Sequence, residues 1–489
     1  MRFLWFFALL YYIYFIISGS FVLNNERYFV LFDDAMISMD YAKSLVRGCG
    51  LVWFCGAPRV EGITNLGWTL YMALLHLIPL PPSKLPLLVQ ITGAILLLGS
   101  GYFAYKVAEK IKQGTGIWAL TLTLFYMPLI YWSLVGMEVS ALVFITFFAL
   151  YLYVKDKTTL IPFLMALGVL IRMDYALVVL VFFLLVGWKE RLKILSAVFI
   201  MLLGMTVFRV LYYGDIFPNT YYLKATGLDI YTYLRGIYVA LKHILIYNPF
   251  LYGLAFYWAF KIRDKLSKVF IFAFIVLVLY VVKVGGDVWE SSFQSNRFFL
   301  NIFPFTVLLT SFTLSEITRK LKIILVILSL MGIHPSRIRV FLRPYEEFHI
   351  SYNPRYLWRI YKIGEITRDG AKIAVAAAGI IPYYLENRYF IDLLGKNDRY
   401  IAKLKPKTGN MKVSLVKKFK YFPPGHNKWD YSYSIGKLKP DVIVNVWVLD
   451  KIDSSEFYPY VRDYIYIFPY GLLLKNSPKI IWEKVKRQD

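Results

Sequence analysis

The chain has few residues of the kinds that build metal centres or disulfide frameworks. Its 489 residues include two cysteines and five histidines. Cys49 and Cys55 have no histidine beside them in the sequence, so they do not make a metal site by themselves. The pair is compatible with a small disulfide in an oxidising compartment and, on spacing alone, equally with two free thiols. No metal or other cofactor is predicted.

Acidic residues are also scarce. The chain has 31 Asp and Glu against 56 Lys and Arg, a net charge of +25. In a soluble protein this excess would suggest a nucleic-acid partner, but nothing in the sequence resembles a nucleic-acid-binding motif. The basic residues cluster in short loops between apolar runs, which is typical of cytoplasmic loops in membrane proteins. Membrane lipid and a phosphate-bearing substrate are therefore the expected partners.

Long polar stretches are missing from the first two thirds of the chain. The sequence is 58% hydrophobic and 18% aromatic, more than a soluble protein of this size needs. The sequence predicts a membrane domain over residues 1–333 and a water-exposed domain over 334–489. The first apolar run is expected to remain as an anchor, because no clear cleavage site follows it.

The apolar runs predict a polytopic α-helical membrane protein. A helix that crosses a bilayer needs roughly 20 apolar residues, which gives about eleven spans here. The run 64–78 is short and is followed by prolines, so we expect a re-entrant or surface-lying helix there. With this assignment every basic short loop falls on one side, as the positive-inside rule requires. The expected spans are 3–21, 85–108, 117–134, 139–154, 161–171, 175–188, 194–211, 243–260, 269–282, 298–312 and 323–333.

This arrangement also predicts the topology. The N-terminus would be cytoplasmic and the C-terminal domain extracytoplasmic, in a multi-pass protein of the plasma membrane. Residues 372–379, 389–394 and 441–448 read as short buried strands, and 380–386 as the start of a helix. Strands that alternate with helices indicate a small α/β domain.

Residues 24–84 form the predicted first external loop, with juxtamembrane helices. The loop carries two adjacent carboxylates, Asp33 and Asp34. Acidic residues at membrane depth are usually functional, although many only mark the solvated end of a helix. We expect Glu138 to be such a solvated end. Arg172 and Asp174 are expected to form a local ion pair that contributes little if it is exposed.

The first loop also carries an ordered motif. Residues 33–70 read D-D-A-x-I-S-x-x-Y-A-x-x-L-x-x-G-x-G-L-V-W, followed by R-V-E-G-x-T-N-x-x-W-T-L. This motif resembles the opening of a family of GT-C membrane glycosyltransferases that includes the mycobacterial-type arabinofuranosyltransferases. The segments 214–224, 285–297 and 423–430 resemble shorter parts of the same family. Met36, Met39 and Ile63 depart from the family pattern, so no particular sugar is assigned.

The resemblance implies a GT-C fold and a reaction. A sugar would move, with inversion, from a polyprenyl-phosphate donor to an extracytoplasmic acceptor glycan, lipid or protein, and the C-terminal domain would contact the acceptor. Such a transfer needs a base for the acceptor hydroxyl and cations for the leaving phosphate. Some GT-C enzymes use a divalent metal near the first-loop carboxylate, but we see no full ligand set here.

The candidate site residues follow from this chemistry. Asp33 and Asp34 are the predicted catalytic residues, one as base and one as orienting partner, and their closeness should raise one pKa. Arg297, Lys224 and Arg172 are the predicted ligands of the donor phosphate, although a cation at the end of a span often has no role beyond its position. The predicted substrate-binding residues are Arg59, Glu61, Asn65, Asn219, Tyr221, Tyr222, Asp287 and His426. A lone histidine in a loop, as His426 is, is more often a surface residue.

Two other functions fit a basic polytopic chain. A transporter or flippase for lipid-linked sugars commonly shows internal repeats and broken helices. The sequence has no repeat, and its acidic residues collect on one predicted face, which favours the enzyme. A non-catalytic membrane subunit would tolerate replacement of Asp33 and Asp34.

Overall fold

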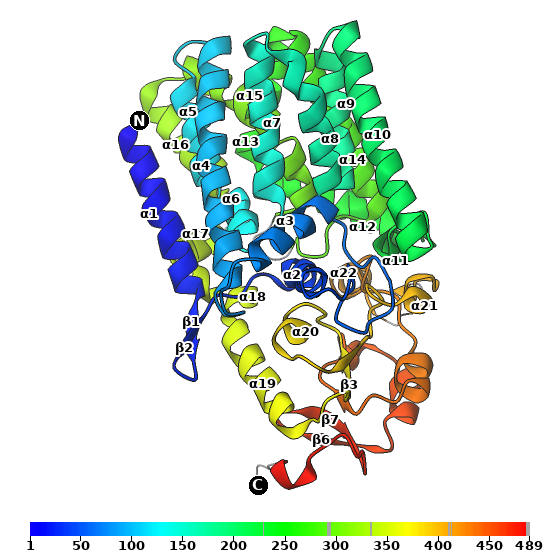
Figure 1. Cartoon of the computed structure of the whole chain (residues 1–489). Coiled ribbons are helices and arrows are strands. Elements are labelled where there is room, and N and C mark those ends of the chain that lie inside the picture. Colours follow the sequence, from blue (N-terminus) through cyan, green and yellow to red (C-terminus); the bar gives the residue numbers. More distant parts are fainter. Residues whose placement is uncertain (228, 291–294, 333–334, 409–410, 412, 486–489) are drawn as a thin grey trace.

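The computed structural model shows a bundle of long helices that stands on a smaller mixed α/β region (Figure 1). The structure describes residues 1–227, 229–290, 295–332, 335–408, 411 and 413–485. The predicted domain boundary at 333–334 lies outside the described residues. Figure 1 places the N-terminus in the bundle and the C-terminus at the far tip of the mixed region.

Several helices of the described chain are long and apolar enough to cross a membrane. Four qualify singly, and up to seven spans result if each of three bent pairs counts as one. The single helices are α1 (Arg2–Gly19), α4 (Leu85–Ile111), α10 (Trp188–Tyr213) and α14 (Lys265–Val284). The bent pairs are α5 (Gly116–Phe125) with α6 (Met127–Leu134), α12 (Ile230–Leu241) and its continuation with α13 (Pro249–Ile262), and α16 (Arg319–Met331) with α17 (Pro335–Leu342).

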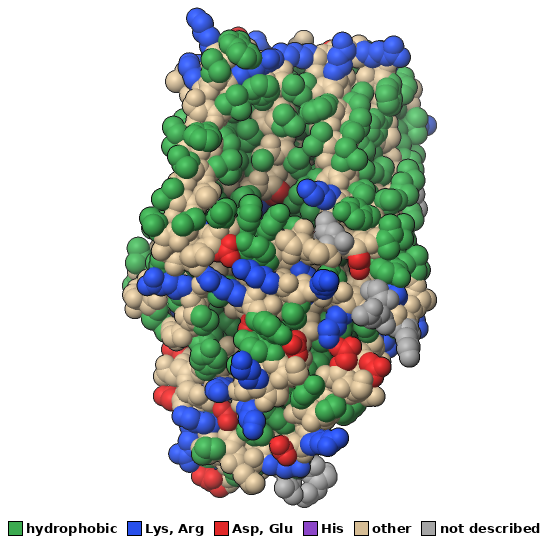
Figure 2. Space-filling model, turned by 90° about the vertical axis from the view of Figure 1, so that its right-hand side faces the viewer, with side chains coloured by type: hydrophobic (Ala, Val, Ile, Leu, Met, Phe, Trp, Pro, Cys, Tyr) green, Lys and Arg blue, Asp and Glu red, His purple; other side chains and the backbone are tan. Residues whose placement is uncertain are grey.

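Shorter apolar helices fill the rest of the bundle. These are α7 (Val139–Val154), α8 (Ile161–Ile171), α9 (Ala176–Leu185) and α15 (Phe303–Glu316). Apolar side chains cover most of the bundle face that Figure 2 shows, which suits contact with lipid. These helices indicate a multi-pass membrane protein. The expectation of eleven spans stays a prediction, and its last span ends at residue 333, outside the described residues.

Two predicted straight spans are broken by proline. Helices α5 and α6 meet at 49°, just before Pro128 in the first turn of α6. The run 243–260 was wrong as a single span. Its first residues continue α12 as a π-helical turn, η3 (Lys242–Tyr247), and the chain turns by 89° before α13 starts at Pro249. A proline lacks the N–H that would continue the preceding helix, so it begins a new one.

Two helices of the first loop lie at the end of the bundle that meets the mixed region. They are α2 (Asp33–Val46) and α3 (Leu66–His76), beside each other in Figure 1. Helix α3 has 11 residues and is not among the helices long enough to span, in line with the predicted re-entrant or surface-lying helix. Cys49 and Cys55 form a disulfide in the turn after α2. Of the two possibilities that their spacing left open, a disulfide or two free thiols, the structure has the disulfide.

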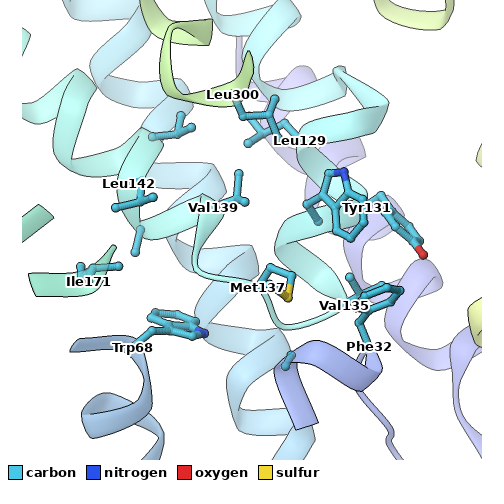
Figure 3. Close-up of a cluster of buried hydrophobic side chains, with 14 of the residues drawn as sticks. Phe32, Trp68, Leu129, Tyr131, Val135, Met137, Val139, Leu142, Ile171 and Leu300 are labelled. Atoms are coloured by element: carbon cyan, nitrogen blue, oxygen red, sulfur yellow. The ribbon is translucent and has the colours of Figure 1, made fainter. Parts of the chain in front are cut away.

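A buried apolar cluster holds the start of α2 against the bundle (Figure 3). Phe32, which directly precedes α2, packs edge-on against Trp132 of α6 at 5.4 Å between ring centroids. Its backbone N–H donates to Val135 O over 3.0 Å. Both rings are buried, and each such side chain contributes roughly 1.5–3 kcal/mol by leaving water. The two carboxylates that follow Phe32 are therefore fixed in place.

The mixed region contains a five-stranded sheet in the order β4-β3-β5-β7-β6. Its strands are β3 (Lys372–Val375), β4 (Tyr389–Asp392), β5 (Val442–Ile443), β6 (Tyr464–Ile467) and β7 (Gly471–Leu474). Strands β4, β3 and β5 are parallel, whereas β7 is antiparallel to β5 and β6. The three predicted strands are the parallel ones, but β5 has two residues where eight were predicted. The predicted helix start is α20 (Ile380–Tyr384).

The carboxyl ends of the parallel strands face α2. The loop after β3 binds Asp33 through Gly379, and the loop after β4 brings Lys396 to Asp34. In sheets of this kind the carboxyl ends are where ligands usually bind.

Candidate functional site

Asp33 is held by backbone groups and keeps one oxygen free. Its Oδ1 accepts from the N–H of Gly379 over 3.1 Å and of Ile380 over 3.0 Å. In the described chain its Oδ2 has no hydrogen-bond partner, and Asp33 lines the large cavity described below. Burial raises the pKa of Asp33 to about 6. A carboxylate with a free oxygen and a pKa near neutral is suited to accept a proton.

Asp34 has a different environment one residue on. Lys396 and Arg297 both contact its carboxylate, Arg297 over 3.4 Å. Burial alone would raise the pKa of Asp34, but the charges of Lys396 and Arg297 outweigh it and hold the pKa well below its usual range. Asp34 is therefore ionised and engaged with cations. The sequence predicted that the two neighbouring carboxylates divide their roles, and their surroundings differ in that way.

Four cationic side chains line a small pocket next to Asp34. This cation pocket has a volume of about 30 Å³, and its basic lining residues are Arg172, Lys224, Arg297 and Lys396. In the described chain Lys224 makes no ion pair or hydrogen bond, and burial lowers its pKa to about 8, with repulsion from Lys396 acting the same way. The Nη1 of Arg297 and the hydroxyl of Thr220 are buried there without a partner among the described residues. These groups are free to bind an anion.

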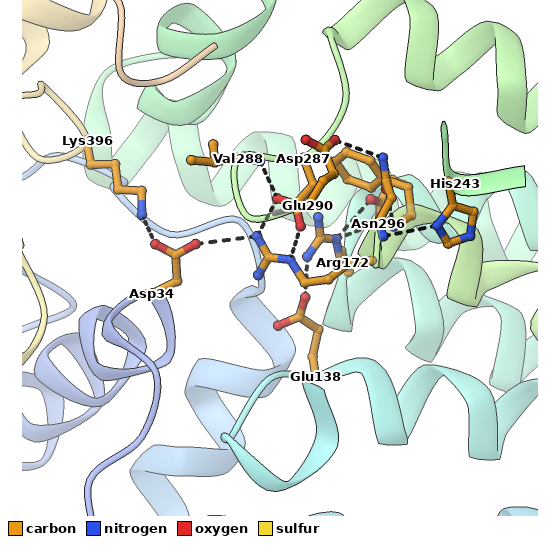
Figure 4. A network of polar contacts seen from close by, with 12 residues as sticks. Asp34, Glu138, Arg172, His243, Asp287, Val288, Glu290, Asn296 and Lys396 are labelled. Atoms are coloured by element: carbon orange, nitrogen blue, oxygen red, sulfur yellow. Dashed lines mark hydrogen bonds and ion pairs between the residues drawn. The ribbon is translucent and has the colours of Figure 1, made fainter. Parts of the chain in front are cut away.

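A network of ion pairs fixes the two arginines of the pocket (Figure 4). Asp287 accepts from Arg297 at Nε over 2.6 Å and at Nη2 over 2.7 Å. Arg172 is bound by Asp174 over 2.8 Å and by Glu138. Asp287 thus holds a predicted phosphate ligand, and its predicted contact with substrate stays a prediction.

Glu138 differs from the expectation. It is fully buried, pairs with Arg172 and accepts from the side-chain amide of Asn65 over 2.9 Å, so it is not a solvated helix end. Asn65, a predicted substrate residue, lines the cation pocket and bridges α2 to this network through Ser38. A buried carboxylate needs such partners, because leaving it alone would be costly.

A large cavity adjoins the cation pocket. It has a volume of about 860 Å³ between α2, the parallel strand ends and helices α18 (Phe348–Ser351) and α19 (Asn353–Ile366). Asp34, Ile37 and Lys396 line both hollows. The aromatic lining includes Trp289, Tyr356, Tyr421 and Trp447. Flat aromatic faces beside scattered polar groups suit the binding of a sugar-containing ligand.

His426, a predicted substrate-binding residue, is not a surface residue as a lone loop histidine often is. It is buried in the wall of the large cavity, with its ring 4.5 Å from that of Trp447. Burial lowers its pKa to about 3, so the imidazole is neutral at physiological pH. His426 Nδ1 and Trp289 Nε1 are buried without a partner among the described residues. A ligand hydroxyl that reached either atom would supply the missing hydrogen bond.

The remaining predicted substrate residues lie outside these two hollows. Arg59 is exposed and stacks over Tyr212 at 4.7 Å. Glu61 forms a buried ion pair with Arg209 over 2.7 Å. The other two are Tyr221, exposed and stacked on Phe217, and Tyr222, bonded to Asp215.

Asn219 lies outside both hollows and holds the loop that carries Lys396. Its amide nitrogen lies within 3.2 Å of three backbone carbonyls in the loop after β4, those of Gly395, Lys396 and Asp398. From the other side, Asp392 accepts from the N–H groups of Leu394, Gly395 and Asn397. The loop that carries Lys396 is therefore fixed by both parts of the chain.

Lys396 was missed in the sequence. It follows a predicted strand by two residues, in Leu394-Gly395-Lys396. A polar residue just past a strand in an α/β domain was a usable signal, because carboxyl ends of parallel strands gather at one edge. Its partner Asp34 lies 362 positions away in the sequence, so the local sequence pattern does not indicate the contact.

An apolar groove runs up the side of the bundle near the cation pocket. This lateral groove, of about 710 Å³, lies between α8 and α10 and reaches Leu66 at the start of α3. Leu66 directly follows Asn65 of the cation pocket. In the described chain no group of three or more His, Cys, Asp or Glu side chains is placed to hold a metal ion.

The fold and the two hollows define a multi-pass membrane protein with a mixed α/β region that closes a polar site at one end of its helices. A family model described as a domain of unknown function, DUF8728, matches residues 350–482, which include the whole sheet. The chain matches none of the curated proteins with which it was compared.

Proposed function

We propose that the protein is an inverting membrane glycosyltransferase of the GT-C type that takes a sugar from a polyprenyl-phosphate donor. The observation that carries the proposal is the junction at α2. There a carboxylate with a free oxygen faces a large aromatic cavity, and a pocket lined by four cations lies directly behind it. This transfer requires a base on one side of the anomeric carbon and an anion site on the other.

The proposed step uses these groups in fixed roles. The acceptor hydroxyl lies in the large cavity and gives its proton to Asp33 as its oxygen attacks the anomeric carbon. The bond between that carbon and the phosphate oxygen breaks at the same time, and polyprenyl phosphate leaves with the electron pair. Arg297, Lys224 and Lys396 hold the charge that develops on the phosphate. Asp34 keeps Lys396 and Arg297 in place.

The lateral groove supplies a place for the donor tail. Its lining is apolar, it lies between two membrane helices, and its end at Leu66, nearest the mixed region, is next to the cation pocket. A prenyl chain in this groove would stay out of water, as it does in the bilayer. The phosphate would then reach the cations without leaving the membrane boundary.

The proposed topology has about eleven spans, a cytoplasmic N-terminus and an extracytoplasmic site. Lys and Arg gather along the end of the bundle far from the mixed region in Figure 2, as the positive-inside rule expects of a cytoplasmic face. The disulfide between Cys49 and Cys55 lies at the opposite end and suits an oxidising compartment. The acceptor would then be an extracytoplasmic glycan, lipid or protein.

A flippase or transporter for lipid-linked sugars is the second candidate. The observation in its favour is that two helix breaks touch inside the bundle, where the Tyr126 hydroxyl donates to Asn248 over 2.8 Å. Broken helices that meet in this way occur in transporters. The polar site at the mixed region is harder to explain by transport, because it combines an Asp33 oxygen and a lysine, Lys224, that have no partner in the described chain.

The test is sugar transfer by the purified protein in nanodiscs, with a panel of polyprenyl-phosphate sugars and membrane glycans as acceptors. Asp33→Asn should lower kcat by about 10²–10⁴, the usual contribution of a general base. Asp369→Asn, an exposed carboxylate far from α2 in the sequence, is the control for charge and folding. Turnover that survives in folded Asp33→Asn would refute the role of Asp33, and translocation without transfer would favour the flippase.

A further inference from the structure

The large cavity has a closed end and an open end. Its closed end lies at Asp33 and the buried His426, whereas its open end is marked by exposed lining residues. Phe348 of α18 is 64% exposed and Tyr352 is 50% exposed. Arg339 and Val340 of α17 line the same end. Lys420 is a further exposed lining residue, from the mixed region.

This open end lies against a membrane helix. Tyr11 of α1 stacks on Phe341 of α17 with 4.4 Å between ring centroids, and the Tyr14 hydroxyl donates to Leu342 O over 2.7 Å. Helix α1 is one of the four that are long enough to span, and its outer face exposes apolar side chains such as Phe3 and Ile17. The mouth of the cavity is therefore next to surface that faces lipid.

Exposed apolar side chains continue from α1 to the mouth. Ile338 and Leu342 of α17, Tyr345 and Phe348 all present more than a third of their surface. Contiguous exposed apolar side chains at a site mark contact with something apolar. A methyl glycoside has no apolar chain to place on this rim, whereas an acyl or prenyl chain would lose its contact with water there.

The two apolar approaches lie on different sides of the bundle. Helices α1 and α17 are at one edge in Figure 1, and α8 and α10 of the lateral groove are at the other. The cation pocket is lined by residues near the lateral groove and by none of the mouth residues. Two amphiphiles can thus reach Asp33 and Asp34 at once, one from each side.

We infer that the acceptor is a membrane-anchored glycan, whose sugar end enters the large cavity while its apolar anchor stays beside α1 and α17. This rests on the proposed function and narrows its acceptor class from glycan, lipid or protein to a glycolipid. The sugar end would stack on Trp289 and Trp447 and bring a hydroxyl to Asp33. The anchor would contact Val340, Leu342 and Phe348.

The test compares each glycan of a panel in two forms, as an octadecyl glycoside in the nanodisc and as a methyl glycoside in solution, with the same donor. For the glycan that is used, the octadecyl form should have a kcat/KM at least about tenfold higher, since a buried chain of a few CH₂ groups suffices for that factor. Leu342→Asp, at an exposed anchor contact outside the cavity lining, should remove most of this advantage and leave turnover of the methyl form unchanged. Tyr466→Asp, an exposed aromatic on β6 and outside the cavity lining, is the matched control.

Equal kcat/KM for the two forms, or an advantage that persists in Leu342→Asp, would overturn the inference and leave the proposed transferase intact. Release of polyprenyl phosphate is measured in the same reactions. If no donor is consumed with any acceptor, the proposed function fails and the inference falls with it.

Discussion

Two neighbouring carboxylates carry the site at the scale of single residues, and their surroundings separate their pKa values. Asp33 accepts two backbone hydrogen bonds, but burial prevails and raises its pKa to about 6. Asp34 touches two cations, which keep its pKa well below the usual range. A pair of titratable groups with diverging pKa values is a common mark of acid–base chemistry. In the proposed reaction, the difference assigns proton transfer to Asp33 and the holding of cations to Asp34.

This difference predicts a bell-shaped pH dependence of kcat/KM for sugar transfer. Below about pH 6 Asp33 is protonated and cannot accept the acceptor proton, so the rate should rise as pH rises through 6. Lys224 has its pKa lowered to about 8 by burial, so it loses its charge above that pH and donor binding should weaken. In Lys224→Met the alkaline limb should disappear. A rate that is flat between pH 5 and 9 in wild-type protein would contradict both assignments.

At the scale of elements, short segments hold the residues of the site in place. The disulfide between Cys49 and Cys55 closes the turn that carries Trp53, whose indole N–H donates to Ala378 O over 2.8 Å. The next residue, Gly379, donates its N–H to Asp33. The disulfide is thus two contacts away from the proposed base. Such a short closed loop also restricts the unfolded chain.

Removal of the disulfide should therefore affect both stability and rate. Replacement of both cysteines by serine should lower the free energy of unfolding by about 2 kcal/mol, the chain-entropy value for a loop of this length. It should also lower kcat, with little change in the KM for the donor, because Asp33 and not the cation pocket is disturbed. Thermal unfolding and initial rates check this, with and without reductant. Wild-type protein that keeps its full kcat after verified reduction would show that the turn does not position Asp33.

The sequence was a better guide to helices than to the sheet. Apolar runs predicted α4, α10 and α14 with ends within six residues of those observed, because span length is a local property of the chain. It missed β6 and β7, and overran β5, which has two residues held between partners from distant segments. Strand pairing depends on residues far apart in the chain, so local pattern does not fix it.

The candidate site was predicted in part for the same reason. Asp33, Asp34, Arg172, Lys224 and Arg297 came from four separate segments, yet they line the same two hollows. Arg59, Tyr221 and Tyr222 do not line them. Glu61 pairs with Arg209 only when the first loop packs on α10. In the sequence, Arg209 stands inside an apolar run. Charges inside such runs are the signal to follow, because they need partners.

At the scale of the whole molecule, the account requires the site and the basic loops to lie on opposite sides of the membrane. Single cysteines introduced by Lys110→Cys and Lys437→Cys test this, since both lysines are exposed and the native cysteines are already bonded. An impermeant maleimide should label position 437 in intact cells and position 110 only after permeabilisation. The reverse pattern would place the polar site in the cytoplasm.

The central claim is that the cation pocket binds the phosphate of a prenyl donor, and binding of the product tests it without knowledge of the sugar. Polyprenyl phosphate should bind the protein in nanodiscs about tenfold to a hundredfold more tightly than polyprenol, because hydrogen bonds to charged groups contribute about 1.5–3 kcal/mol. Lys224→Met should lose most of this difference. Lys403→Met, which removes a surface ion pair with Asp215, should keep it. Equal affinity for polyprenol and polyprenyl phosphate in wild-type protein would contradict the account.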